Sequence, residues 1–179
     1  MGTLGSPVIL LAEDLEEDII IIERAFKQVY VPHRLMVVHN GEDVVRYLMG
    51  QDKYADRKTY PFPMLLLLDL KMPGTDGFEI LKWLRDIPSF GSLRVVVLTS
   101  SDHIHDVNRA YKLGANSFLV KPSDFENTLQ LAKTLTQHWL VDSRSPTTLV
   151  LPPRAIPPDA QIAPKPKLPK NDRKGRPQA

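Results

Sequence analysis

The sequence predicts an α/β fold, an open and doubly wound five-stranded parallel sheet with helices on both faces. Three observations support this prediction. Short apolar runs alternate with longer helical patterns up to about residue 142, as expected of a parallel sheet with crossover helices. Two of the runs, VILLA and MLLLL, are apolar without alternation, as in strands covered on both faces. Polar residues follow the runs directly, at the edge where such sheets bind ligands.

Five strands follow from the apolar runs. The first and third, VILLA and MLLLL, are predicted at the centre of the sheet because both of their faces need cover. The second run is followed only by His39, and it is predicted to lie at the edge of the sheet. The predicted strands are residues 8–12, 35–38, 64–68, 94–98 and 117–120.

Five helices are predicted between and after the strands. The last has the clearest pattern, because its large apolar residues recur at spacings of three and four from Phe125 to Trp139, which places one face on a core. Right-handed connections and cover on both faces favour the strand order 2-1-3-4-5, a flavodoxin-like arrangement. The polar insert 51–63 is interpreted as a solvated loop, with partner docking as the alternative. The predicted helices are residues 16–31, 42–49, 78–86, 102–113 and 125–140.

Charge and composition divide the chain near residue 143. Residues 1–143 carry 15 Lys and Arg against 19 Asp and Glu, whereas residues 144–179 carry eight against two. The second segment also holds nine of the 16 prolines and no aromatic residue, so it has too little apolar surface to offset the entropy of ordering. We therefore expect a flexible lead over 1–6, one folded domain over 7–143 and a disordered, basic, proline-rich tail over 144–179.

Composition also excludes several classes of protein. The chain has no cysteine, so it has neither disulfides nor a thiolate zinc site, and a cytoplasmic location is expected. The apolar run Met64 to Leu68 is far shorter than the roughly 20 residues of a membrane span. The tail is too short and too rich in proline for a helix-turn-helix, so no DNA-binding output domain is expected.

Charged and hydroxyl side chains follow four of the predicted strands. Glu13 and Asp14 follow the first, Asp69 the third, Thr99 the fourth and Lys121 the fifth. Because the carboxyl ends of parallel strands meet at one edge of a sheet, these groups are expected to converge. Three carboxylates close together repel one another unless a cation joins them, and hard oxygen ligands suit Mg²⁺.

This arrangement predicts a metal-dependent phosphoryl site. A carboxylate can attack a phosphoryl donor while the cation and an ammonium group neutralise the phosphoryl oxygens. Asp69, on the central strand, is the best placed nucleophile, with Thr99 and Lys121 as partners of the phosphoryl group. Each residue also has a plain structural interpretation as a helix cap, a turn residue or a solvated surface lysine. The functional interpretation is favoured because all of these residues fall at the same edge of the sheet.

Four motifs in order, VILLAED, LLLLDLKMPGTDGFE, VVVLTSS and SFLVKP, resemble the receiver domains of response regulators in two-component signalling. The resemblance covers about residues 7–141. It implies that Asp69 is the phosphoacceptor and that Asp14 and Asp69 bind Mg²⁺ with the backbone carbonyl of Lys71. Glu13 is implied to take the other acidic position at the metal, through water.

The same resemblance assigns roles at the last two strands. Thr99 and Lys121 are implied to contact the phosphoryl group, and Lys121 and Pro122 to be joined by a cis peptide bond. Phe118 falls at the position of the family's rotameric switch. The implied function is a signalling switch that is phosphorylated by a sensor histidine kinase and catalyses its own phosphotransfer, and not an enzyme that turns over a metabolite.

Finer features resemble the small regulators of bacterial phytochromes, which would make the partner a light-sensing histidine kinase. They are the VPHRL segment, the insert 51–63 and the end of the last helix, QHWL. A homodimer built on the fourth helix, the fifth strand and the fifth helix is a further prediction, because Leu131 and residues 139–141 widen the apolar surface of the last helix.

Two other functions are weighed against this interpretation. A phosphatase of the haloacid-dehalogenase type would need a second aspartate two residues after the nucleophile, where this chain has Lys71. A nucleotide or flavin module would need a glycine-rich loop after the first strand, where this chain has acids.

Overall fold

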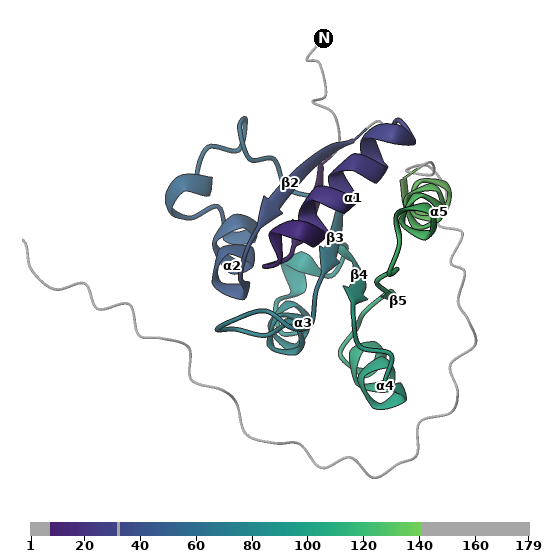
Figure 1. The fold of residues 1–179 in the computed structure, drawn as a ribbon. Coiled ribbons are helices and arrows are strands. Elements are labelled where there is room, and N and C mark those ends of the chain that lie inside the picture. Colours follow the sequence, from purple (N-terminus) through teal and green to yellow (C-terminus); the bar gives the residue numbers. More distant parts are fainter. Residues whose placement is uncertain (1–7, 32, 141–179) are drawn as a thin grey trace, which may run out of the picture. The chain divides into compact units, whose positions relative to one another are not determined.

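The computed structural model describes residues 8–31 and 33–140, so the predicted lead 1–6 and tail 144–179 lie outside the described residues. In the described part, the strands form one parallel sheet in the order β2-β1-β3-β4-β5 (Figure 1). This order confirms the predicted topology. The strands are β1 (Val8–Ala12), β2 (Arg34–Val38), β3 (Leu65–Leu68), β4 (Arg94–Thr99) and β5 (Ser117–Val120).

Helices cover both faces of the sheet (Figure 1). On one face α1 packs beside α5, and on the other lie α2, α3 and α4. Two short 3-10 turns, η1 (Asp52–Tyr54) and η2 (Pro88–Phe90), and a π turn, η3 (Thr136–Leu140), complete the described part. The helices are α1 (Glu16–Gln28), α2 (Gly41–Met49), α3 (Gly77–Arg85), α4 (Ile104–Lys112) and α5 (Phe125–Leu135).

The central strands are buried on both faces, and this explains their unbroken apolar sequences. In β1, Leu10 and Ala12 face the α2–α3–α4 layer, whereas Ile9 and Leu11 face the α1–α5 layer. Every residue of β1 and β3 is buried. A strand buried on both faces gains apolar contact from each residue, so polar alternation is absent.

The first helix ends at Gln28, three residues before the predicted end. Tyr30 adopts a left-handed backbone with φ of 52°. The amide of Tyr30 then donates to the carbonyl of Lys27, and the amide of Val31 to the carbonyl of Phe26. This is the Schellman pattern that closes helices, here without the usual glycine. Apolar residues recur in the sequence beyond Gln28, but the chain leaves the helix at Tyr30.

The insert 51–63 is exposed along most of its length, as predicted for a solvated loop, but it also packs against α2 through a buried tyrosine. Tyr54 is buried, and its ring lies 5.1 Å from that of Tyr47 and 5.2 Å from that of Tyr60. The guanidinium of Arg57 donates to the carbonyls of Tyr47 at 2.8 Å and Leu48 at 2.7 Å. These carbonyls belong to the last turn of α2, which needs such donors. The insert therefore caps a helix and shields its aromatic residues.

Two glycines allow the loops at the carboxyl edge of the sheet to approach closely. A Cβ on Gly77, the first residue of α3, would lie 2.3 Å from the carbonyl oxygen of Asp69. A Cβ on Gly41, at the start of α2, would lie 2.3 Å from the carbonyl oxygen of Thr75. The start of α3 is thus pressed against the end of β3, which fixes the backbone that carries Asp69.

Among residues 8–31 and 33–140, no helix combines the length and the apolar character needed to cross a membrane.

Candidate functional site

Three carboxylates meet where β1 and β3 end. The two strands are paired in parallel, with Ala12 beside Leu68, so the residues that follow them are neighbours. The backbone holds them there, because the amide of Asp69 donates to the carbonyl of Ala12 at 3.0 Å and the amide of Glu13 to that of Val38 at 3.0 Å. Carboxylate oxygens of Glu13, Asp14 and Asp69 all lie within 4.8 Å of one another. The predicted convergence of these acids is present.

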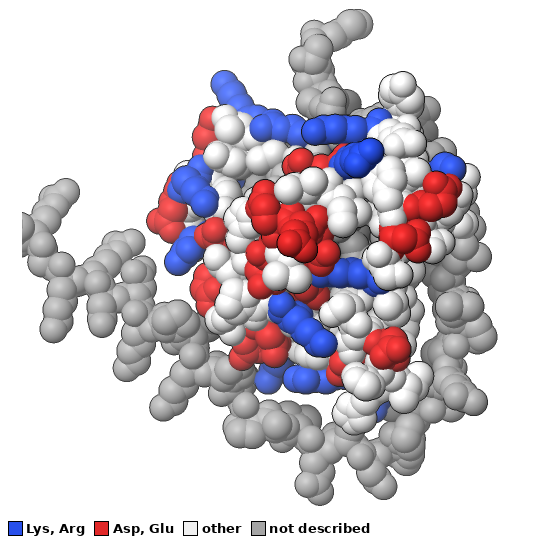
Figure 2. Space-filling model, in the orientation of Figure 1, with Lys and Arg blue, Asp and Glu red and all other residues white. Residues whose placement is uncertain are grey.

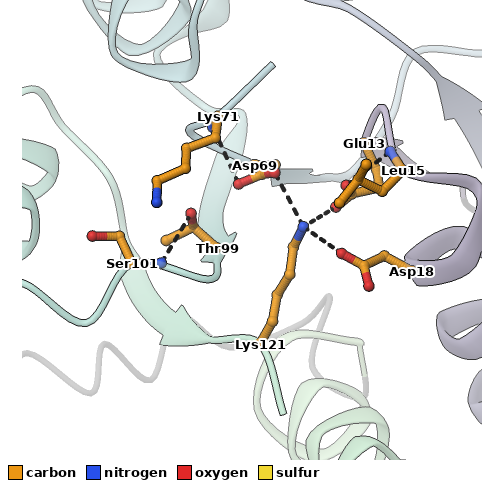
Figure 3. A network of polar contacts seen from close by, with 8 residues as sticks. All are labelled: Glu13, Leu15, Asp18, Asp69, Lys71, Thr99, Ser101 and Lys121. Carbon is orange, nitrogen blue, oxygen red and sulfur yellow. Dashed lines mark hydrogen bonds and ion pairs between the residues drawn. The ribbon is translucent and has the colours of Figure 1, made fainter. Parts of the chain in front are cut away.

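Lys121 reaches this group from the end of β5 (Figure 3). Its Nζ lies 2.5 Å from Glu13 Oε2, 2.8 Å from Asp18 Oδ2 and 3.0 Å from Asp69 Oδ2. The lysine side chain is only 10% exposed. A buried ammonium group is retained where several anionic partners compensate for lost hydration.

The Lys121–Pro122 peptide bond is trans, so the cis bond implied by the resemblance is wrong for this structure; the described residues contain no cis peptide bond. The trans isomer is the intrinsically preferred one. With this trans bond, the Nζ of Lys121 contacts the carboxylates of Glu13, Asp18 and Asp69.

Burial and neighbouring charges shift the pKa values of Glu13 and Lys121. Burial raises the pKa of Glu13, and the hydrogen bond and charge of Lys121 offset this only in part. For Lys121, burial lowers the pKa, but the hydrogen bonds to Asp18 and Glu13 and the charge of Asp69 outweigh it, so the pKa is raised overall. The ammonium group therefore stays protonated at neutral pH, whereas the ionised Glu13 is costly.

A divalent cation fits the donors that are present. Asp14 Oδ1 is buried and has no hydrogen-bond partner among the described residues. Buried polar atoms are nearly always paired, so such an atom marks a position for a ligand. The donor set consists of carboxylate oxygens, which suit hard cations such as Mg²⁺. One ammonium group balances one of the negative charges, and a cation would balance more.

Thr99, Lys71 and Phe118, the other residues of the predicted site, do not join these ion pairs. Thr99 is fully buried at the end of β4, and its Oγ1 accepts a long hydrogen bond of 3.5 Å from the amide of Ser101. The amide of Lys71 donates to Asp69 Oδ1 at 3.2 Å, which orients the carboxylate (Figure 3). Phe118 is partly buried and packs against the core on the α2–α3–α4 side.

The sequence reasoning missed two polar contacts at this edge. Asp18, in the first turn of α1, binds Lys121 directly. Ser101 is buried after β4, and its hydroxyl donates to Asp106 in the first turn of α4 at 2.5 Å. For Asp18 the sequence gives no separate signal, because it is one of three acids in the first turn of α1 and the helix dipole favours all three.

The surface around the site is acidic. Figure 2 shows acidic side chains grouped over α1, in the middle of the face seen there. The first turn of this helix carries Glu16, Glu17 and Asp18. An acidic rim repels phosphate unless a cation intervenes.

A family model described as the response regulator receiver domain matches residues 9–133. The probable methanogenesis regulatory protein FilR2 of Methanothrix harundinacea is 32% identical over 139 residues, which are 78% of this chain and 87% of that protein. The response regulator Rcp1 of a Synechocystis species is 32% identical over 133 residues, 74% of this chain and 88% of that protein.

Solved structures of response regulators are also similar to this chain. The phosphorylated cyanobacterial phytochrome response regulator RcpA is similar with a TM-score of 0.70 at 31% identity, over 76% of this chain and 96% of that one. The Mn²⁺-bound form of Rcp1 is similar with a TM-score of 0.68 at 31% identity, over 75% of this chain and 95% of that one.

Proposed function

This chain belongs to the response regulator receiver family of two-component signalling, and on that basis we propose that it is a switch controlled by Mg²⁺-dependent phosphorylation of Asp69. The observation that carries the proposal is the contact between Lys121 Nζ and Asp69 Oδ2, at 3.0 Å, beside the cluster of three carboxylates. A carboxylate held between an ammonium group and a cation site is equipped to receive a phosphoryl group.

Asp69 is the nucleophile in this proposal. One of its carboxylate oxygens attacks the phosphorus of a phosphohistidine; the bond between phosphorus and nitrogen breaks, and the imidazole keeps the electron pair. The amide of Lys71 holds Asp69 Oδ1 and leaves Oδ2 toward Lys121. The ammonium group of Lys121 neutralises charge on the phosphoryl oxygens, and the hydroxyl of Thr99 donates to one of them.

The metal has a defined set of candidate ligands. Asp14 and Asp69 would hold Mg²⁺ directly with the backbone carbonyl of Lys71, and Glu13 would act through water. When bound, Mg²⁺ supplies positive charge that reduces the repulsion between the carboxylates and an anionic donor. The buried, unpaired Oδ1 of Asp14 supports this assignment. The family binds divalent metal, and the Mn²⁺-bound relative described above agrees with it.

The output is a change of conformation. A phosphoryl group adds about two negative charges and three acceptor oxygens, which attract the Thr99 hydroxyl and draw the loop after β4 inward. Phe118, which is only partly buried, then has room to rotate. The protein on this account catalyses its own phosphorylation and dephosphorylation and turns over no metabolite.

The phosphoryl donor is a sensor histidine kinase, as receiver domains imply. We propose a kinase of the phytochrome type, because RcpA is a phytochrome response regulator by its description. The test is phosphotransfer from purified phosphorylated kinases: a phytochrome kinase should label this chain faster than an unrelated kinase does. Equal labelling by both would remove the support for a phytochrome partner.

The site assignment is tested with Asp69→Asn and acetyl phosphate in Mg²⁺. Asparagine keeps the shape of the side chain and lacks the nucleophilic oxygen, so labelling should be lost. Asp76→Asn is the matched control, since it changes an acid in the same loop to a residue that still caps α3. Wild type and the control should be labelled, and excess chelator should prevent this. Undiminished labelling of Asp69→Asn would contradict the assignment.

A further inference from the structure

Asp18 connects α1 to the end of β5. Its Oδ2 accepts a hydrogen bond of 2.8 Å from Lys121 Nζ, across 103 residues of sequence. The carboxylate is 31% exposed and the lysine side chain 10%. Figure 3 shows the two side chains pointing toward each other, with Asp18 on the opposite side of the ammonium group from Asp69.

A simpler explanation of Asp18 is that it stabilises its helix. It is the third residue of α1, where an acid interacts favourably with the helix dipole. However, Glu16 and Glu17 occupy the same turn and provide the same interaction from exposed positions. Only Asp18 of these three forms an ion pair with Lys121 among the described residues. The helix dipole therefore accounts for an acid in this turn, but not for this contact.

The three carboxylate partners of Lys121 differ in their other contacts. An ammonium group has three N–H donors; here it donates hydrogen bonds to Asp18 and Asp69 and forms an ion pair with Glu13. Glu13 and Asp69 also belong to the carboxylate cluster that suits a metal, whereas Asp18 stands outside it. When a metal and a phosphoryl group engage Glu13 and Asp69, Asp18 is the acceptor that remains for the lysine.

We infer that Asp18 is a positioning residue, which holds the Lys121 ammonium group where the phosphoryl group forms. The inference rests on the proposed function and deepens it. It needs no contact between Asp18 and the phosphoryl group, because Asp18 acts through the lysine.

The surroundings strengthen the ion pair. Asp18 and Lys121 line a crevice between α1 and α5 together with Ile21, Pro122 and Leu131. The crevice has a volume of about 20 Å³, enough for about one water molecule. The Lys121 side chain is only 10% exposed and that of Asp18 31%, so the contact is partly shielded and is more than an exposed surface ion pair.

The kinetic test compares Asp18→Ala with Glu17→Gln. Both remove one charge from the first turn of α1, but only the first removes an acceptor from Lys121. The rate of labelling by acetyl phosphate should fall about tenfold in Asp18→Ala, because hydrogen bonds to charged groups are the stronger ones. Glu17→Gln should stay within about twofold of wild type, and Asp18→Glu should restore part of the rate. The affinity for Mg²⁺, measured by calorimetry, should change less than twofold in all three.

A second measurement observes the lysine without any chemistry. In the ¹⁵N spectrum of lysine ammonium groups, the Lys121 signal should be visible for wild type and Glu17→Gln, because an ordered ammonium group exchanges its protons slowly. It should be broadened beyond detection in Asp18→Ala.

Each outcome has a separate meaning. An unchanged or faster rate in Asp18→Ala would overturn the inference and leave the proposed function intact, as would an equal loss in Glu17→Gln, which would assign the effect to the helix dipole. A Lys121 signal that persists in Asp18→Ala would also overturn it. Absence of labelling in wild type would instead contradict the proposed function, and the spectra would still report on the position of the lysine.

Discussion

Burial makes the ionised form of Glu13 unfavourable. Its side chain is almost completely buried, and burial raises its pKa in spite of the ion pair to Lys121. A carboxyl group whose pKa is raised by folding stabilises the protein fully below the pKa of the unfolded chain, and this contribution is lost as the pH rises through the folded value. At neutral pH the ionised Glu13 is therefore unfavourable in the metal-free protein.

Glu13→Gln should consequently be more stable than wild type at pH 7 in excess chelator. The glutamine fills the same volume without a charge, and the difference should shrink toward pH 4, where Glu13 becomes protonated. Thermal unfolding at both pH values measures this. Adding Mg²⁺ should raise the midpoint of wild type more than that of the variant, because the metal binds the native state. A lower midpoint for Glu13→Gln at pH 7 in chelator would show that the ion pair outweighs burial.

The meeting of Glu13, Asp14, Asp69 and Lys121 followed from the sequence, because each comes directly after a strand of one parallel sheet. The contact of Asp18 with Lys121 could not be predicted from the sequence. An acid in the first turn of a helix has a sufficient local reason to be there, so its contact with a lysine 103 residues away is visible only in three dimensions. The trans bond before Pro122 was missed because the expectation came from a resemblance, not from the residues.

Gly77 packs the start of α3 against the backbone of Asp69. It is the first residue of α3 and follows the N-cap Asp76. Its amide donates to the carbonyl of Leu70 at 3.1 Å, and its missing Cβ leaves room for the backbone of Asp69 and Leu70. The glycine of the TDGFE motif therefore serves close packing at the site.

Gly77→Ala should destabilise the protein by about 1–3 kcal/mol, the usual cost of overpacking a well-packed position. It should also slow the labelling of Asp69, since the end of β3 must shift to admit the methyl group. Urea unfolding and acetyl phosphate labelling measure the two effects. Gly91→Ala is the matched control, because Gly91 has helical backbone angles and a Cβ there would lie 3.2 Å from its nearest neighbour. A Gly77→Ala protein as stable and as reactive as the control would refute this role.

The strands were predicted to within one residue at each end, because apolar runs buried on both faces have sharp boundaries. The helices were less exact at their ends. The first stops where Tyr30 turns left-handed, and the last passes at Thr136 into a π turn. Its threonine hydroxyl donates to the carbonyl of Ala132, a competing contact that apolar spacing does not reveal. The insert 51–63 is polar on average, but it packs through aromatic residues. Its composition therefore did not reveal that Tyr54 is buried.

The α4–β5 surface is a candidate contact between two copies of the chain. Ile104 is 71% exposed, and Tyr111 and Val120 are also exposed large apolar side chains. Exposed apolar patches usually mark contacts. The α5 surface is a weaker candidate, because Leu131 and Trp139 pack against the core, and residue 141 lies outside the described residues.

Light scattering of the phosphorylated protein should give the mass of two chains, and Val120→Glu should give the mass of one. Ile20→Glu is the control, because Ile20 is similarly exposed on α1, which covers the other face of the sheet. A mass of one chain for wild type at micromolar concentration, with and without phosphorylation, would refute the dimer.

Locating the phosphoryl group on the chain tests whether Asp69 receives it. Borohydride reduces an acyl phosphate to an alcohol, so a phosphorylated aspartate is recovered as homoserine. The wild-type chain is incubated with acetyl phosphate and Mg²⁺, treated with borohydride, digested and sequenced by mass spectrometry. We expect homoserine in place of Asp69, only when Mg²⁺ is present. Homoserine in place of Asp14 or Asp76, with Asp69 unchanged, would contradict the account.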